Sequence, residues 1–295
     1  MTQPEESIES LDGILPPPPF LTEYFANLHG HYAEKLNAFM TSLWSKIVSS
    51  LKSSILNRGK TPAILRTLNS AAGLELIIPS FCACNIVLAP SMSRRLWWDI
   101  VRTLPPDKEK VNKRVTNYYE GKRWSILKSM VHNWMAIETY RQREKILKDA
   151  LQAHLDEKWT LSIPALLPQI DGISLNVIMR HQLPVKKASV IIDKSISKEA
   201  GRTLPSQLFI SLDMDRFTPL EMVSIYTLLY YLESQLYRRT DFAQHADEAN
   251  QSSFLNRHSV LHGVQVDYAS KLNSLMCFLV LDILSLASKS VEGPD

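Results

Sequence analysis

A short segment near the C-terminus carries the residues best suited to acid–base chemistry. Asn256 to Gly263 reads Asn-Arg-His-Ser-Val-Leu-His-Gly, and it contains Arg257, His258 and His262. Histidine can take or give a proton because its ordinary pKa lies near neutrality. Arginine stays charged and can hold two phosphate oxygens with its planar fork. The residue types therefore suit chemistry on a phosphodiester.

The spacing leaves two interpretations open. On an α-helix five residues advance by about 500°, so Arg257 and His262 lie about 140° apart, whereas His258 and His262 share one face. One helix therefore does not assemble a whole site. In the structural alternative, His262 caps the helix C-terminus beside Gly263, where a cation meets the helix dipole favourably, and Arg257 is a surface ion-pair partner.

The segment resembles the motif of the HEPN superfamily, a group of helical-bundle proteins that includes many metal-independent ribonucleases. The motif is an arginine, usually followed by a polar residue, and then a histidine after three more positions. Arg257, His258 and His262 match it residue by residue. The surroundings are also similar, since Gly263 breaks the chain before an apolar closing helix. The resemblance covers about residues 135–290.

This resemblance implies a metal-independent endoribonuclease with Arg257, His258 and His262 at a cleft between two copies. RNA cleavage without a metal needs a base for the 2′-hydroxyl, an acid for the leaving oxygen and a cation for the phosphate. The implied partners are RNA, a second copy of the chain and an antitoxin or other regulatory protein, in stress or phage defence. A non-catalytic HEPN-like module that binds RNA or protein is the alternative.

An acidic residue in an otherwise apolar segment is a further candidate. Asp171 ends the run from Ile163 to Ile170, which also looks like a phrase of HEPN-like proteins, where Glu is more usual at this position. Asp171 is either a catalytic-site carboxylate that faces the Arg/His cleft and orients Arg257, or a solvated residue near a proline-bent turn. Glu233 is a weaker candidate, more consistent with an exposed helix face.

A basic stretch from Arg94 to Lys128 holds ten Lys or Arg against four acids. Aromatic residues interleave with the cations, and this combination can hold phosphates and stack on unpaired bases. A solvated basic face over core aromatics is the alternative interpretation. The residues predicted to contact RNA are Arg94, Arg95, Lys113, Arg114, Lys122 and Arg123.

Other functional classes lack their signatures. The sequence has no Gly-rich phosphate loop and no metal-ligand spacing among its eight histidines and three cysteines, so we predict neither metal nor cofactor. The acidic, proline-rich start is unlike an export signal, and the apolar run from Leu275 to Leu281 is too short to cross a bilayer. These features predict a cytoplasmic protein with free thiols and no membrane association.

The elements that must position these residues are predicted to be helices. Only 9 of 295 residues are Gly, and apolar residues recur at helical spacing from Leu36 to Ile55. We predict an all-α fold with a disordered leader over 1–20, a helical region of unknown role over 21–134 and a HEPN-like helical bundle over 135–290. The expected helices are a long helical stretch over 124–158, a helix capped at 162–164, a helix over 218–236 with a Thr218–Glu221 capping box, a short helix over 254–262 and a closing helix over 267–287. The segment over 185–193 alternates weakly, and we interpret it as either a short strand or an insertion.

Overall fold

The fold is described from a computed structural model, which defines residues 84, 86–101, 107–182, 204–212, 216–238 and 255–292. Of this part, 77% is helical and none is in a strand, which confirms the all-α class. All described residues belong to one compact unit that begins at Ile78, so the boundary predicted at 134 falls inside it. The leader over 1–20, the helix over 36–55 and the strand or insertion over 185–193 lie outside the described residues.

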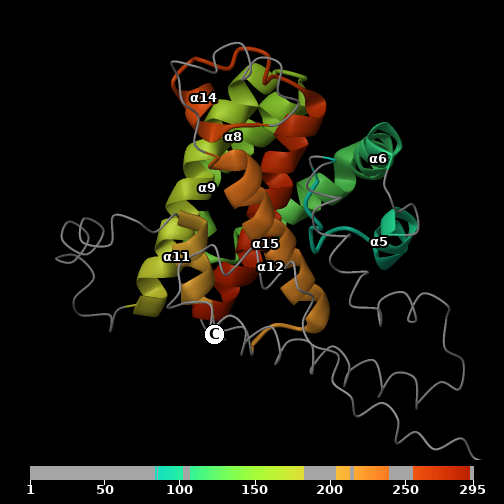
Figure 1. Ribbon diagram of the computed structural model, residues 1–295. Helices are drawn as coiled ribbons and strands as arrows, with labels where there is room; N and C mark the ends of the chain where they lie inside the picture. Colours follow the sequence, from blue (N-terminus) through green and yellow to red (C-terminus); the bar gives the residue numbers. More distant parts are fainter. Residues whose placement is uncertain are drawn as a thin grey trace, which may run out of the picture. The chain divides into compact units, whose positions relative to one another are not determined.

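Two long helices form the centre of this unit. Helix α15 packs against α9, α6, α12 and α8, while α9 also packs against α8, α11 and α14. Figure 1 shows α9 and α15 side by side, with α14 at one end of the bundle. The described helices are α5 (Arg94–Val101), α6 (Lys108–Trp134), α7 (Glu138–Arg141), α8 (Glu144–Leu155), α9 (Trp159–Gln182), α11 (Leu204–Ser211), α12 (Pro219–Tyr231), the π-helical turn η3 (Leu232–Leu236), α14 (Arg257–Leu261) and α15 (Lys271–Glu292).

Helix α15 is the core helix, because every side chain from Asn273 to Ser285 is buried. Its sequence is apolar on all sides, as expected for a helix surrounded by others. By length and composition, α15 and the Trp159–Arg180 part of α9 could each span a membrane. The apolar window of α15 is 78% buried inside the fold, which is typical of the core helix of a soluble protein, and that of α9 is 50% buried.

Local signals set several helix ends. The capping box predicted at Thr218 is confirmed: its hydroxyl accepts a hydrogen bond from the backbone N–H of Glu221, whose carboxylate accepts one from the backbone N–H of Thr218. The cap predicted at 162–164 is wrong, because α9 begins earlier, at Trp159, and Pro164 lies inside it. Pro164 cannot donate to the Thr160 carbonyl, and the hydroxyl of Tyr268 donates to that oxygen instead, at 3.4 Å.

The helical stretch predicted over 124–158 is divided differently. Helix α6 begins at Lys108 and ends at Trp134, and α7 and α8 follow after short breaks. Within α6, Arg123 and Trp124 have φ of 54° and 62°. Two successive residues in the left-handed region interrupt the helical path at this point. The helical stretch predicted to begin at Trp124 therefore begins, in the structure, at an internal break of the longer helix α6.

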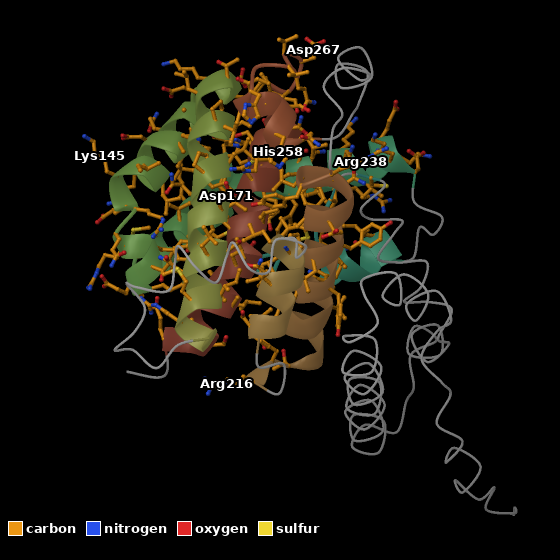
Figure 2. The ribbon with its side chains drawn as sticks, turned by 60° about the vertical axis from the view of Figure 1, so that its left-hand side comes forward. Lys145, Asp171, Arg216, Arg238, His258 and Asp267 are labelled. Atoms are coloured by element: carbon orange, nitrogen blue, oxygen red, sulfur yellow. The ribbon has the colours of Figure 1, made fainter. Side chains whose placement is uncertain are left out.

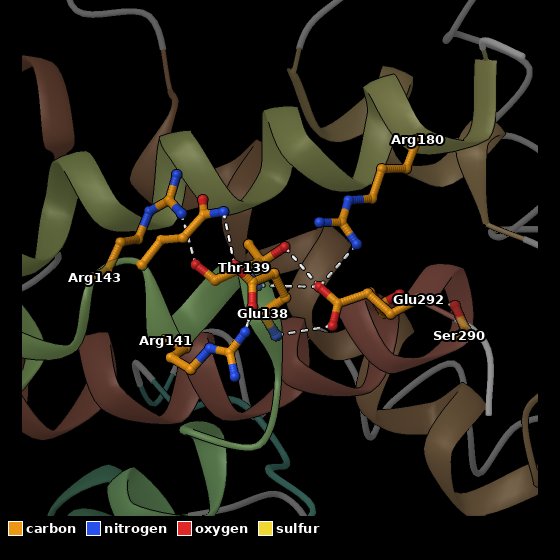
Figure 3. Close-up of polar contacts among 9 residues, drawn as sticks. Glu138, Thr139, Arg141, Arg143, Arg180, Ser290 and Glu292 are labelled. Atoms are coloured by element: carbon orange, nitrogen blue, oxygen red, sulfur yellow. Dashed lines mark hydrogen bonds and ion pairs between the residues drawn. The ribbon is translucent and has the colours of Figure 1, made fainter. Parts of the chain in front are cut away.

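Two carboxylates of α15 form hydrogen bonds with segments that are far from α15 in the sequence. Asp282 accepts hydrogen bonds from the Ser91 backbone N–H at 2.9 Å and from Trp134 Nε1 at 3.3 Å. At the C-terminal end of α15, Glu292 accepts from the backbone N–H groups of Glu138 and Thr139, at 2.9 and 3.1 Å. Glu292 also pairs with Arg180 of α9 at 3.0 Å, and Figure 3 shows these contacts. The helix ends are thus joined by polar contacts around the apolar core.

Candidate functional site

Helix α14 carries the motif and is held in place at both ends. The Asn256 side chain accepts a hydrogen bond from the Ser259 backbone N–H at 3.0 Å and donates to the Arg238 carbonyl at 2.9 Å. At the other end, Gly263 has a φ of 71°, the left-handed conformation that glycine adopts most easily after a helix. The Ser259 carbonyl then accepts from the Val264 N–H at 2.8 Å. These contacts fix a five-residue helix that would not be stable by itself.

Arg257 and Asp171 form the centre of the site. Arg257 Nε donates to Asp171 Oδ2 at 2.6 Å, and Arg257 Nη2 pairs with the same oxygen. Both side chains are largely covered, with 24% of Arg257 and 18% of Asp171 exposed. The two residues lie 86 positions apart in sequence. Of the two interpretations of Asp171, the structure therefore favours the carboxylate that orients Arg257.

Sequence reasoning missed a third member, Tyr237. Its hydroxyl donates to Asp171 Oδ1, and the Arg257 guanidinium carbon lies 5.8 Å from the centre of its ring. Burial and the neighbouring Asp171 carboxylate raise the pKa of the Tyr237 phenol, so it stays a donor at neutral pH. Tyr237 ends an apolar, tyrosine-rich stretch, and only its place just before Arg238 distinguishes it in the sequence. It follows directly after the π-helical turn η3.

The two motif histidines lie one turn apart. Their rings are nearly parallel, with centroids 6.3 Å apart. His258 is half-buried, and His262, the C-cap residue of α14, is exposed. Figure 2 shows His258 and Asp171 on the same part of the bundle. The structure thus brings together all four predicted residues of the site, Asp171 included.

Burial and the charge of Arg257 both act on the protonation of His258. Arg257 Nη1 lies 3.5 Å from His258 Nδ1. Because arginine can only donate, a hydrogen bond between these two atoms requires the neutral ring to carry its proton on Nε2. Burial, followed by the charges of Arg257 and His262, lowers the pKa of His258, although Asp171 acts in the opposite direction. At neutral pH His258 is therefore an uncharged imidazole.

The predicted RNA-binding cations belong to α5 and α6, not to the helices that carry the Arg257 cluster. The side chains of Arg95, Lys113, Arg114 and Arg123 on α5 and α6 are all exposed. Those of Arg94 and Lys122 lie outside the described part of the chain. The four exposed cations remain available to a ligand, although Arg95 lies 4.0 Å from the Asp99 carboxylate and Arg114 donates to the Asp99 carbonyl at 3.3 Å.

The aromatic residues between these cations have structural contacts. Tyr119 shares a 2.6 Å hydrogen bond with the Ser91 hydroxyl, and Trp97 Nε1 donates to a carbonyl at 3.4 Å. Trp124 packs edge-on against His154, with centroids 4.6 Å apart. These contacts favour the interpretation of a basic face over core aromatics rather than a base-stacking platform.

The chemistry available at the site is that of an anchored cation with two imidazoles. Among the described residues, no group of three or more His, Cys, Asp or Glu could hold a metal ion. Asp171 has a donor on each oxygen, so it orients its neighbours and is not placed to accept a proton from a ligand. No protein-family model matches the chain, and neither a curated protein nor a solved structure matches it.

Proposed function

We propose that the protein is a metal-independent endoribonuclease of HEPN-like architecture that acts as a homodimer. The observation that supports this most is the Asp171–Arg257 pair beside His258 and His262. Asp171 occupies the Nε/Nη2 edge of Arg257, so a phosphate is gripped through the remaining N–H groups of Nη1 and Nη2. The arrangement combines a fixed cation, a neutral imidazole that can donate and an exposed imidazole.

The proposed reaction is an internal transfer at phosphorus. The 2′-oxygen of the substrate forms a bond to phosphorus while the bond from phosphorus to the 5′-oxygen breaks. A base takes the 2′-hydroxyl proton, and an acid gives a proton to the departing 5′-oxygen. His262 carries one of these proton steps, and the second copy supplies the group for the other. Arg257 and the Nε2–H of His258 stabilise the charge on the phosphate. The products carry a 2′,3′-cyclic phosphate and a 5′-hydroxyl.

The proposed dimer places α14 at the interface. Exposed apolar residues lie close to the motif: Leu261 in α14 is 38% exposed and Val266, just after it, is 64% exposed. Leu161 at the start of α9 is 61% exposed, one residue from Thr160, to which Tyr268 donates. Apolar residues grouped around a polar site are common at protein interfaces. The apolar, tyrosine-rich segment from Leu220 to Tyr237 is a second candidate for the interface.

A non-catalytic HEPN-like module that binds RNA or protein is the second candidate. The complete pairing of Asp171 favours it, since Arg257 already has a structural partner. In this case the Asp171–Arg257 ion pair holds α14 against α9, and the exposed cations of α5 and α6 bind the nucleic acid.

A cleavage assay distinguishes the two candidates. We expect the wild-type protein to cut single-stranded RNA in EDTA, to leave DNA intact and to produce 2′,3′-cyclic phosphate ends. His262→Ala should cut about 10² to 10⁴ times more slowly, as expected when a general acid or base is lost. His132→Ala is a matched control, because His132 is an exposed histidine of α6 far along the chain from the motif.

Two outcomes would contradict the proposal. One is RNA cleavage that requires added Mg²⁺ or Mn²⁺, and the other is an unchanged rate in His262→Ala. RNA binding without cleavage would favour the module. The dimer is tested separately by light scattering at micromolar concentration, where a monomer would contradict the shared cleft.

A further inference from the structure

Tyr237 is the one side chain of the Asp171–Arg257 cluster that does not come from the motif or its matching segments. It stands 66 positions from Asp171 and 20 from Arg257, at the end of the π-helical turn η3. The Tyr237 backbone N–H donates to the Leu232 carbonyl at 2.8 Å, five residues back. Such wide turns insert one residue into a helix and redirect the side chain that follows, often at functional sites.

The contacts form a chain from the phenol to the histidine. Tyr237 donates to Asp171 Oδ1, Asp171 Oδ2 accepts from Arg257, and Arg257 Nη1 faces His258 Nδ1. The tyrosine ring also lies under the guanidinium, at 5.8 Å. Without the phenol, Asp171 has one free oxygen and can rotate, so Arg257 loses its fixed orientation.

We infer that Tyr237 is a positioning residue, which acts through Asp171 to fix the orientation of Arg257 and, through it, the tautomer of His258. The inference rests on the proposed function for its effect on catalysis, but its effect on His258 is a property of the folded chain alone. The π-helical turn thus has a role in building the site.

The test uses Tyr237→Phe, which keeps the ring and removes only the hydroxyl. The first readout is histidine ¹⁵N NMR of the full chain. In the wild type, the ring of His258 should be neutral at pH 7 and carry its proton on Nε2. In Tyr237→Phe, the Nδ1–H tautomer should also appear, and the pKa of His258 should rise because the charge of Arg257 is no longer held beside it.

The second readout is RNA cleavage across pH. We expect kcat to fall about tenfold in Tyr237→Phe, the effect of one lost hydrogen bond to a charged group, with KM unchanged within about twofold. At lower pH, where His258 is protonated and again carries an Nε2–H, the difference in kcat from the wild type should become smaller. Tyr268→Phe removes a hydroxyl that contacts the Thr160 carbonyl and not Asp171, and it should leave the His258 spectrum unchanged.

A double-mutant cycle tests whether Tyr237 acts through Asp171. If it does, Tyr237→Phe combined with Asp171→Asn should be no worse than Asp171→Asn alone. Additive effects would overturn the inference, and so would an unchanged His258 spectrum in Tyr237→Phe. If the wild type cuts no RNA, the proposed function fails, whereas the NMR comparison still decides the role of Tyr237. Should Tyr237→Phe fail to fold by circular dichroism, the His258 spectrum of Asp171→Asn decides instead, and a wild-type tautomer there would overturn the inference.

Discussion

Asp171 and Asp282, on the two central helices, bind similar partners in different surroundings. Each accepts a hydrogen bond from an aromatic side chain: Tyr237 for Asp171 and Trp134 for Asp282. Asp282 is buried, its second partner is the Ser91 backbone, and burial raises its pKa. Asp171 is partly exposed and pairs with the Arg257 cation.

The difference separates a structural cluster from a candidate site. The contacts of the buried Asp282 join α15 to α6 and to the segment before α5. The contacts of Asp171 leave Arg257 Nη1 and His258 beside the exposed His262. A carboxylate with an aromatic donor is therefore not diagnostic of function. The partly exposed cation next to it is the informative feature.

Two histidines show the same contrast. His154 is 2% exposed, shares a 2.8 Å hydrogen bond with the Ser274 hydroxyl and packs against Trp124 and Phe278. Burial, followed by the charge of Lys271, lowers its pKa from about 6.5 to about 4. In His258, the lowered pKa comes with a partly open surface and a neighbouring cation. His154 serves the fold, whereas His258 faces the candidate site.

The largest expected effect on stability is a loss at acidic pH, which arises because the fold holds His154 neutral. The unfolded chain binds a proton near pH 6.5 and the folded chain only near pH 4, so the free energy of unfolding should fall as pH drops through this window. The loss attributable to His154 is about 3 kcal/mol. Urea unfolding at several pH values should show this slope in the wild type and in His132→Ala.

His154→Leu should lose that part of the slope. The raised pKa of Asp282 changes the free energy of unfolding in the opposite direction, but Asp282 is present in both proteins and its contribution cancels in the comparison. An identical pH slope in His154→Leu and the wild type would show that His154 is not held neutral by the fold.

The two aromatic donors should differ in their effect on stability. Trp134→Phe should lower the free energy of unfolding by about 1–3 kcal/mol, because it leaves the buried Asp282 short of a donor. Tyr237→Phe should lower it by less than about 1 kcal/mol, since water can reach Asp171. Urea unfolding of both variants at pH 7 measures this, and a larger loss in Tyr237→Phe would reverse the comparison.

The smallest effect is expected beside Asp171, at Gly172. A Cβ at this position would lie 3.1 Å from Arg143 Nη2, the far end of a flexible side chain that can move away. Gly172→Ala should therefore stabilise the protein by about 0.5 kcal/mol, as in other helix interiors. Thermal unfolding measures the change, and a loss of more than about 1 kcal/mol would show that Arg143 is fixed by its contact with the Thr139 carbonyl.

Local sequence signals accounted for the helical class and for some helix ends. The apolar spacing and the Thr218–Glu221 box depend on neighbours within a few residues, so they can be recognised in a sequence. The start of α9 could not be recognised in this way. Pro164 leaves the Thr160 carbonyl without its helical donor, and the hydroxyl that donates to it belongs to Tyr268, more than a hundred residues away. The break at Arg123 has no glycine or proline at the left-handed positions to announce it.

The site was only partly predictable for the same reason. Arg257, His258 and His262 stand together in the sequence, and Asp171 was recognisable as an acid in an apolar helix. Its pairing with Arg257 depends on how α9 and α14 pack. The position of Tyr237 depends on that packing and on the π-helical turn before it, which the local sequence does not indicate.

The most direct test of the central contrast compares Asp171→Asn with Asp282→Asn in two assays. Asp282→Asn should lower the free energy of unfolding by about 1–3 kcal/mol and leave the RNA-cleavage rate of the folded protein near that of the wild type. Asp171→Asn should remain within about 1 kcal/mol of wild-type stability and cleave RNA about 10 to 100 times more slowly. Full cleavage activity in Asp171→Asn together with its loss in folded Asp282→Asn would contradict the account.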